Sequence, residues 1–125
     1  NRLNMGDAQF VEVFHSNGGQ LGFFTRIGDA DFYINKGKTQ PECEGNANTN
    51  SCSHYRAVTV YNRLVSRQNN YVVITCESVE QVAEGCSNDP IEIKLEELNP
   101  SGIYQINTLN AEANKQSVNK DVEII

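Results

Sequence analysis

The sequence predicts a single mixed α/β domain, and three observations carry that prediction. Its 125 residues are close to the usual size of one domain. Hydrophobic residues make up 38% and charged residues 21%, which is typical of a globular chain. Several short runs rich in β-formers flank one longer segment whose apolar residues recur at helical spacing. A core of strands and one main helix is therefore expected.

The first strand is predicted at Phe10–His15, a run rich in β-formers that Ser16–Gly19 ends. It is too uniformly apolar for an outer edge, so we expect it to be buried in a larger sheet. The next stretch, Leu21–Gln40, mixes glycines and aromatic residues without a clear period. We expect that stretch to be an irregular, packed excursion with little regular structure.

The main helix is predicted at His54–Arg67, after a polar loop between Cys43 and Cys52. Ser53 is a suitable N-cap for it. Its expected apolar face comprises Ala57, Val58, Tyr61, Leu64 and Val65.

The second half of the chain predicts three further strands. Ser78–Glu84 is expected to form one or two helical turns before Gly85, and Asn99–Gly102 is a turn signal. Residues 111–125 are expected to be a polar tail. The expected strands are Tyr71–Cys76, Ile91–Leu95 and Gly102–Thr108.

Charge and cysteine usage exclude several classes of function. The net charge of −6 argues against nucleic acid as a partner, because nucleic acid requires a basic face. The chain has two histidines and lacks a C-x-x-C pair, which makes a closed zinc site improbable. We expect no metal or cofactor. Sequential pairing of the four cysteines would close two short loops, which suits an oxidising compartment. The sequence thus indicates a protein that is secreted or stored outside the cytosol.

No complete active site is apparent from residue spacing alone. The chain has neither a G-x-S-x-G elbow nor a phosphate-binding glycine loop. Asp29 and Asp31 lack the rest of a calcium loop, so solvated or turn-forming carboxylates are expected there. His54 is the one candidate general base, because a disulfide-pinned loop and a helix start would hold it near the surface with a neutral imidazole. A capping or packing histidine without a chemical role is the alternative that these residues favour on their own.

Several longer runs resemble the pancreatic-lipase-like family, in the order in which that family has them, across residues 2–108. The family's histidine motif is matched by Ser51–Ala57, and its glycine-rich "DFYPNGG…QPGC" stretch by Ile27–Cys43. The remaining matching segments are Asp7–Gly19, Cys76–Cys86 and Gly102–Thr108.

The resemblance implies an α/β-hydrolase fold of which residues 1–110 form the C-terminal part. The nucleophilic serine and the orienting acid would lie upstream of Asn1, and His54 would be the triad base. An upstream lipase-fold segment is therefore the expected partner, with lipid or phospholipid as the substrate. Alone, the chain is expected neither to fold fully nor to hydrolyse esters. Self-association into a homo-oligomer is left open.

The resemblance also bears on the two disulfides and on a lid. The pairs Cys43–Cys52 and Cys76–Cys86 match two pairs of the family, and each would close a short loop. The first loop occupies the position of the family's lid, and a short polar lid is typical of phospholipase A1-type members. The lid-like residues are Glu44, Gly45, Asn46, Ala47, Asn48, Thr49, Asn50 and Ser51.

Four positions depart from the family pattern. A histidine is usual at Asp29, a proline at Ile34, and glycines at Lys36 and Glu42. Lost glycines suggest altered surroundings of the site, because glycine reaches backbone angles that other residues adopt only at a cost. The alternative to an enzyme is therefore a catalytically silent yolk or egg storage protein with the same fold.

Overall fold

The structure, a computed structural model, describes residues 2–66, 71–93 and 101–108. None of the helices in these ranges is both long and apolar enough to cross a bilayer. Two short turns, η1 (Asn35–Gly37) and η2 (Pro41–Cys43), separate the second strand from the main helix. The strands and helices are, in chain order, β1 (Glu12–His15), β2 (Ala30–Ile34), α1 (Thr49–Val65), β3 (Tyr71–Cys76), α2 (Val79–Glu84), β4 (Pro90–Ile93) and β5 (Gly102–Ile106).

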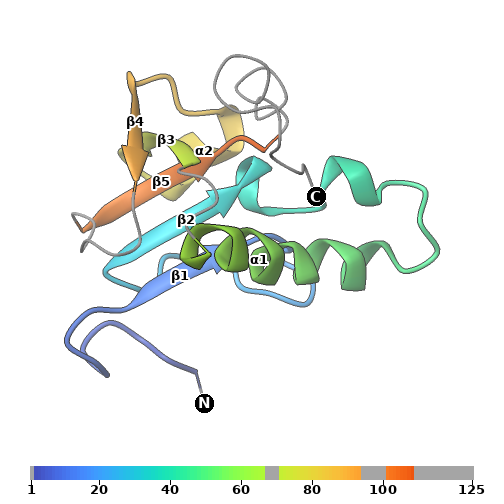
Figure 1. The fold of residues 1–125 in the computed structure, drawn as a ribbon, viewed down its shortest axis with the longest axis horizontal. Helices are drawn as coiled ribbons and strands as arrows, with labels where there is room; N and C mark the ends of the chain where they lie inside the picture. The colour runs from blue at the N-terminus through green and yellow to red at the C-terminus, as the bar shows by residue number, and fades with distance from the viewer. Residues whose placement is uncertain (1, 67–70, 94–100, 109–125) are drawn as a thin grey trace.

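The described strands form one sheet in the order β1-β2-β5-β3-β4 (Figure 1). β1, β2 and β5 are parallel, whereas β3 pairs antiparallel with both β5 and β4. The N-terminal arm and the loop from β1 to β2 run beside the β1 edge, while β4 forms the opposite edge. Within the described part of the chain, β1 thus pairs through one side only.

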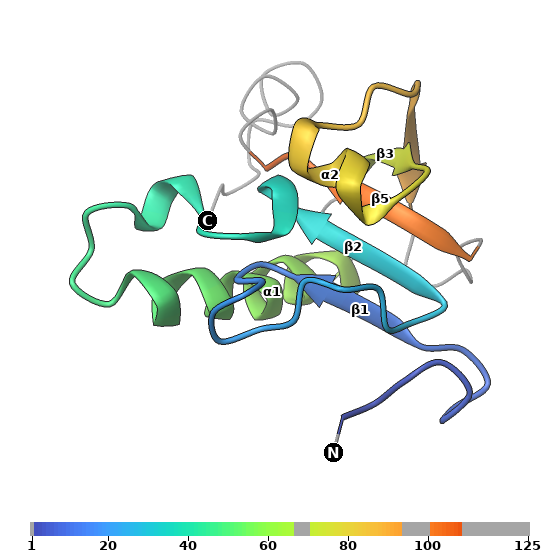
Figure 2. The same cartoon turned by 180° about the vertical axis from the view of Figure 1, so that it is seen from behind.

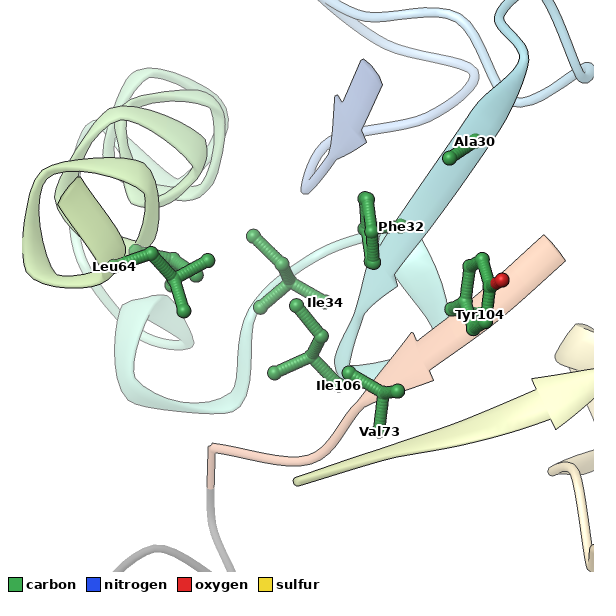
Figure 3. Packing of buried hydrophobic residues seen from close by; sticks show 8 residues of the cluster. Ala30, Phe32, Ile34, Leu64, Val73, Tyr104 and Ile106 are labelled. Atoms are coloured by element: carbon green, nitrogen blue, oxygen red, sulfur yellow. The ribbon is translucent and has the colours of Figure 1, made fainter. Parts of the chain in front are cut away.

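The sheet has a helix on each face (Figures 1 and 2). On β2 the buried side chains alternate, so that Phe32 packs with α1 and Tyr33 with α2. The α1 side holds the larger cluster, in which Leu64 faces the side chains of the central strands (Figure 3). That cluster comprises Ala30, Phe32, Ile34, Val60, Leu64, Val73, Tyr104 and Ile106.

The prediction of little regular structure in Leu21–Gln40 is wrong, because β2 lies within that stretch. All five residues of β2 are buried. A strand covered on both faces does not alternate between apolar and polar residues, and this strand also carries Asp31 as its second residue. It consequently lacks the period that identifies a half-exposed strand.

The predicted start of the main helix is also wrong. α1 begins at Thr49 after the N-cap residue Asn48, so Ser53 lies inside the helix. Ser53 is fully buried, and its hydroxyl accepts a hydrogen bond from the Gln40 backbone N–H at 2.9 Å. A serine that fits the sequence pattern of an N-cap therefore serves a tertiary contact instead.

The apolar face predicted for α1 is only partly the buried one. Leu64 is buried and Ala57 packs against the core, but Val58, Tyr61 and Val65 are exposed. Polar side chains also point inward from this helix. A face predicted from hydrophobic residues alone therefore lies to one side of the face that is actually buried. The buried residues of α1 are Ser53, Arg56, Val60, Arg63 and Leu64.

The remaining predicted elements are present, but two of them start at other residues: β1 starts at Glu12 rather than Phe10, and β4 starts at Pro90 rather than Ile91. β3 spans the predicted Tyr71–Cys76, and α2 follows the N-cap Ser78, whose hydroxyl accepts from the Gln81 N–H. β5 lies within the predicted Gly102–Thr108. Arg67, Leu95, Asn99, Pro100 and the tail 111–125 lie outside the described residues.

Both disulfides join the predicted partners. Cys43–Cys52 links η2 to the first turn of α1, with 5.8 Å between the Cα atoms. Cys76–Cys86 links the last residue of β3 to the second residue after α2, with a Cα separation of 5.5 Å. Disulfides of this kind form in oxidising compartments, which agrees with an extracellular location.

The backbone of η1 adopts angles that favour glycine, at Lys36 as well as at Gly37. Lys36 has φ of 70° and Gly37 has φ of 73°, both in the left-handed region. A Cβ at Gly37 would lie 2.6 Å from Tyr33 Cδ1, so glycine is required at that position. Lys36 has a side chain and therefore carries backbone strain.

Lys36→Gly is expected to stabilise the protein by about 1 kcal/mol, because glycine adopts this φ without strain. Denaturant unfolding measures the change. Lys38→Gly is the matched control, since Lys38 has φ of −113° and its Nζ lies 4.8 Å from the Phe24 ring centroid. That control should lower stability; equal gains in both variants would contradict the strain at Lys36.

Candidate functional site

His54 lies in the second turn of α1 with an exposed side chain. Its imidazole faces the loop after β1, where a Cβ at Gly22 would lie 3.4 Å from Nδ1 and 3.6 Å from Cε1. Among the described residues, none makes a hydrogen bond or ion pair with the ring. The ring is thus exposed, and no described residue forms a hydrogen bond with it.

The expected placement of His54 at a helix start is not what the structure shows. Thr49 is the first helical residue, so His54 lies beyond the first turn of α1. The helix dipole acts most strongly within that first turn, and its effect on His54 is therefore weaker than expected. The position after the disulfide loop is confirmed, since Cys52 lies two residues before His54. What holds the histidine is therefore tertiary contact more than the helix terminus.

The residue that follows β1 contacts the turn of α1 that carries His54. Ser16 Oγ donates to the His54 carbonyl at 3.1 Å and accepts from the Ala57 N–H at 3.1 Å. The next residue, Asn17, accepts from the Leu21 N–H through Oδ1 at 2.9 Å and is almost fully buried. These bonds fix the loop that lies against the imidazole.

Gln40 forms hydrogen bonds that connect the segments around His54. It is completely buried, and its Nε2 donates to the carbonyls of Ser16, Ile34 and Lys38 at 3.1, 2.8 and 2.9 Å. Its backbone N–H donates to Ser53 Oγ in α1. β1, β2 and α1 are thereby joined at the end of the sheet nearest His54.

A second histidine, which the sequence reasoning missed, forms a buried pair with Asp31. His15 Nε2 donates to Asp31 Oδ2 at 2.7 Å, and His15 Nδ1 donates to the Phe23 carbonyl at 2.8 Å. The imidazole also stacks on Tyr33, with 4.2 Å between ring centroids. A carboxylate inside an otherwise apolar strand is the sequence signal that requires such a partner.

The expectation of solvated or turn-forming carboxylates is half right. Asp31 is fully buried rather than solvated, yet it accepts from the N–H groups of Ile27 and Gly28 and so shapes the turn before β2. Asp29, which departs from the family's histidine, accepts from the Val11 N–H at 2.8 Å. Its carboxylate fastens the chain entering β1 to the same turn.

The pKa of the Asp31 carboxyl lies below its usual value. Burial alone raises that pKa, but the hydrogen bond from His15, the N–H groups of Ile27 and Gly28 and the charge of His15 together outweigh it. The folded state therefore favours the ionised carboxylate more than the unfolded state does. The resulting stability is present above the unfolded pKa near 3.8 and is lost as the pH falls through the lower folded value.

Asp31→Asn is expected to lower stability at pH 7 by about 3 kcal/mol, because it leaves His15 without its charged partner. It should also flatten the loss of stability below pH 4, which denaturant titrations at several pH values measure. Asp29→Asn is the control, with a loss of about 1 kcal/mol and an unchanged acid limb. An acid limb that stays steep in Asp31→Asn would contradict the assignment.

Glu42, another departure from the family pattern, has a structural role. Its carboxylate forms an ion pair with Nε of Arg56, which is buried in α1 two residues after His54. A buried guanidinium needs such a partner, so the carboxylate compensates a charge that a glycine would leave unpaired. The pair adds a link between η2 and α1.

The lid-like loop is shorter than predicted. Thr49, Asn50 and Ser51 belong to α1, which leaves Glu44–Asn48 as the connecting loop. All five loop residues are exposed. In the described ranges, no three His, Cys, Asp or Glu side chains gather as a metal site would require.

Comparison with known proteins adds evidence that is independent of the geometry. A family model described as Lipase matches residues 1–120. Lipase member H of Xenopus tropicalis is 35% identical over 92 residues, which is 70% of this chain and 20% of that protein. Lipase member H of Rattus norvegicus is 38% identical over 90 residues, 67% of this chain and 20% of that protein.

An insect relative is similar over a shorter stretch. Phospholipase A1 2 of Polistes dominula is 38% identical over 68 residues, 54% of this chain and 20% of that protein. The chain thus spans about a fifth of the length of the curated relatives it matches.

Proposed function

Because this chain belongs to the lipase family, we propose that it forms, together with an upstream lipase-fold segment, a secreted carboxylic ester hydrolase. His54 is its general base. The observation that carries this proposal is the His54 imidazole itself: exposed, free of structural hydrogen bonds among the described residues, and held on a braced turn of α1. A structural histidine is normally bonded at its ring, as His15 is.

In this mechanism the upstream segment supplies a serine and an acid. His54 Nε2 takes the serine proton as the serine oxygen attacks the ester carbonyl carbon, and then returns it to the leaving alcohol. Water then attacks the acyl-enzyme while His54 takes the water proton. His54 returns that proton to the serine oxygen, and the fatty acid is released. The acid accepts from Nδ1–H. Gly22 lies beside that nitrogen, where a Cβ would come into van der Waals contact with Nδ1 at 3.4 Å.

The short exposed loop supports phospholipid as the substrate class. Glu44–Asn48 contains one apolar side chain, Ala47, so it offers little cover for an apolar acyl site. One of the similar insect proteins is named a phospholipase A1. We therefore favour release of a fatty acid from phospholipid over hydrolysis of triacylglycerol.

The test is fatty-acid release by this chain joined to or associated with its upstream segment. Phosphatidylcholine vesicles and a triacylglycerol emulsion are supplied separately, and release is followed by titration at constant pH. Faster release from the vesicles supports the phospholipase assignment, and faster release from the emulsion replaces it with a neutral-lipid lipase. No release from either substrate, by protein that is folded, would leave a catalytically silent storage role.

A further inference from the structure

Ser16 contacts the backbone of α1 at the turn that carries the proposed base. Its hydroxyl donates to the His54 carbonyl and accepts from the Ala57 N–H, each at 3.1 Å. The side chain is 3% exposed, so water does not readily replace either bond. Only a group that both donates and accepts can bridge these two positions, and the hydroxyl is such a group.

The backbone at Ser16 is held by Gln40 and by the side chain of the residue before it. Its carbonyl accepts from Gln40 Nε2 at 3.1 Å. The preceding residue, His15, is bonded at both ring nitrogens, to the Phe23 carbonyl and to Asp31. These contacts, at 2.8 and 2.7 Å, hold the His15 side chain at both edges of its ring. The hydroxyl therefore projects from the residue just after β1, where the neighbouring contacts leave the chain little freedom to shift.

A bridge from a fixed strand end to one helical turn sets where that turn lies. The intrahelical bonds of α1 hold its shape but do not set its position along the sheet. Ser16 adds that second constraint at the residue that matters for proton transfer. We propose that Ser16 is a positioning residue, which holds the His54 imidazole at the distance and angle needed to accept the serine proton. This inference rests on the proposed function for its kinetic consequence, but the placement of the ring can be tested without activity.

The experiment compares Ser16→Ala and Ser16→Thr with the wild-type protein, in the form that contains the upstream segment. Ser16→Ala should lower kcat by about 10-fold with KM nearly unchanged, because a displaced base slows proton transfer without altering substrate binding. The His54 ring signals in a proton–carbon NMR spectrum, assigned by their loss in His54→Ala, should move or broaden. Ser16→Thr keeps the hydroxyl and should restore both readouts.

Ser66→Ala is the matched control. Its hydroxyl donates to the Arg63 carbonyl at 2.9 Å at the far end of the same helix, so it removes a similar bond away from His54. Wild-type kcat and His54 signals in Ser16→Ala would overturn the proposal, as would equal changes in Ser66→Ala. If the wild-type protein hydrolyses no ester, the proposed function fails, and the His54 signals alone then decide the positioning role.

Discussion

His54→Ala is expected to lower the rate of ester hydrolysis by about 10⁴-fold while the protein stays folded. The side chain is exposed and makes no hydrogen bond that the described structure shows, so its removal costs little stability. The loss arises because the serine would then have no base to take its proton. Initial rates of fatty-acid release from vesicles measure the effect, and circular dichroism verifies the fold.

Asn62→Ala is the control for this variant. Asn62 is exposed, two turns farther along α1. The substitution should leave the rate within about twofold of wild type, as is usual for surface changes away from a site. A His54→Ala protein that retains most of the activity would show that another group serves as the base.

The second large effect is expected from removal of the Cys43–Cys52 bridge. The double variant Cys43→Ala/Cys52→Ala should lose about 3 kcal/mol of stability, the amount that closing so short a loop contributes in the unfolded chain. It should also lose most activity below its melting point. The bridge fixes the first turn of α1, two residues before His54, so the imidazole loses one of its constraints.

The other disulfide provides a matched control for that variant. Cys76 and Cys86 are 10 residues apart against 9 for the first pair, so a similar loss of stability is expected. The bridge lies on the α2 side of the sheet, away from His54. Cys76→Ala/Cys86→Ala should therefore keep its kcat. Equal loss of kcat in both double variants would contradict a specific role for the first bridge.

Local sequence signals predicted those elements whose own residues determine them. β3 and the short helix before Gly85 have strong local patterns, and the structure confirms both. β2 was missed because a strand buried on both faces has no alternation. The start of α1 was misplaced because Ser53 fits an N-cap pattern, while its partner, Gln40, comes from another part of the chain.

For the candidate site, too, only the features encoded in local sequence could be predicted. The motif resemblance pointed to His54, and the local spacing of the cysteines pointed to the bridge beside it. The contacts that brace His54 were not predictable, because Ser16 and Gln40 reach α1 only through the fold. The buried pair of His15 and Asp31 depends likewise on the register of β1 against β2.

Covalent trapping can locate the nucleophile that His54 would activate. The protein containing this chain and its upstream segment is treated with a fluorophosphonate, and the adduct is located by mass spectrometry. We expect one adduct, on a serine outside residues 1–125, which forms rapidly in wild type and about 10³-fold more slowly or not at all in His54→Ala. Absence of any adduct on the folded protein, or equal labelling rates in wild type and His54→Ala, would contradict this expectation.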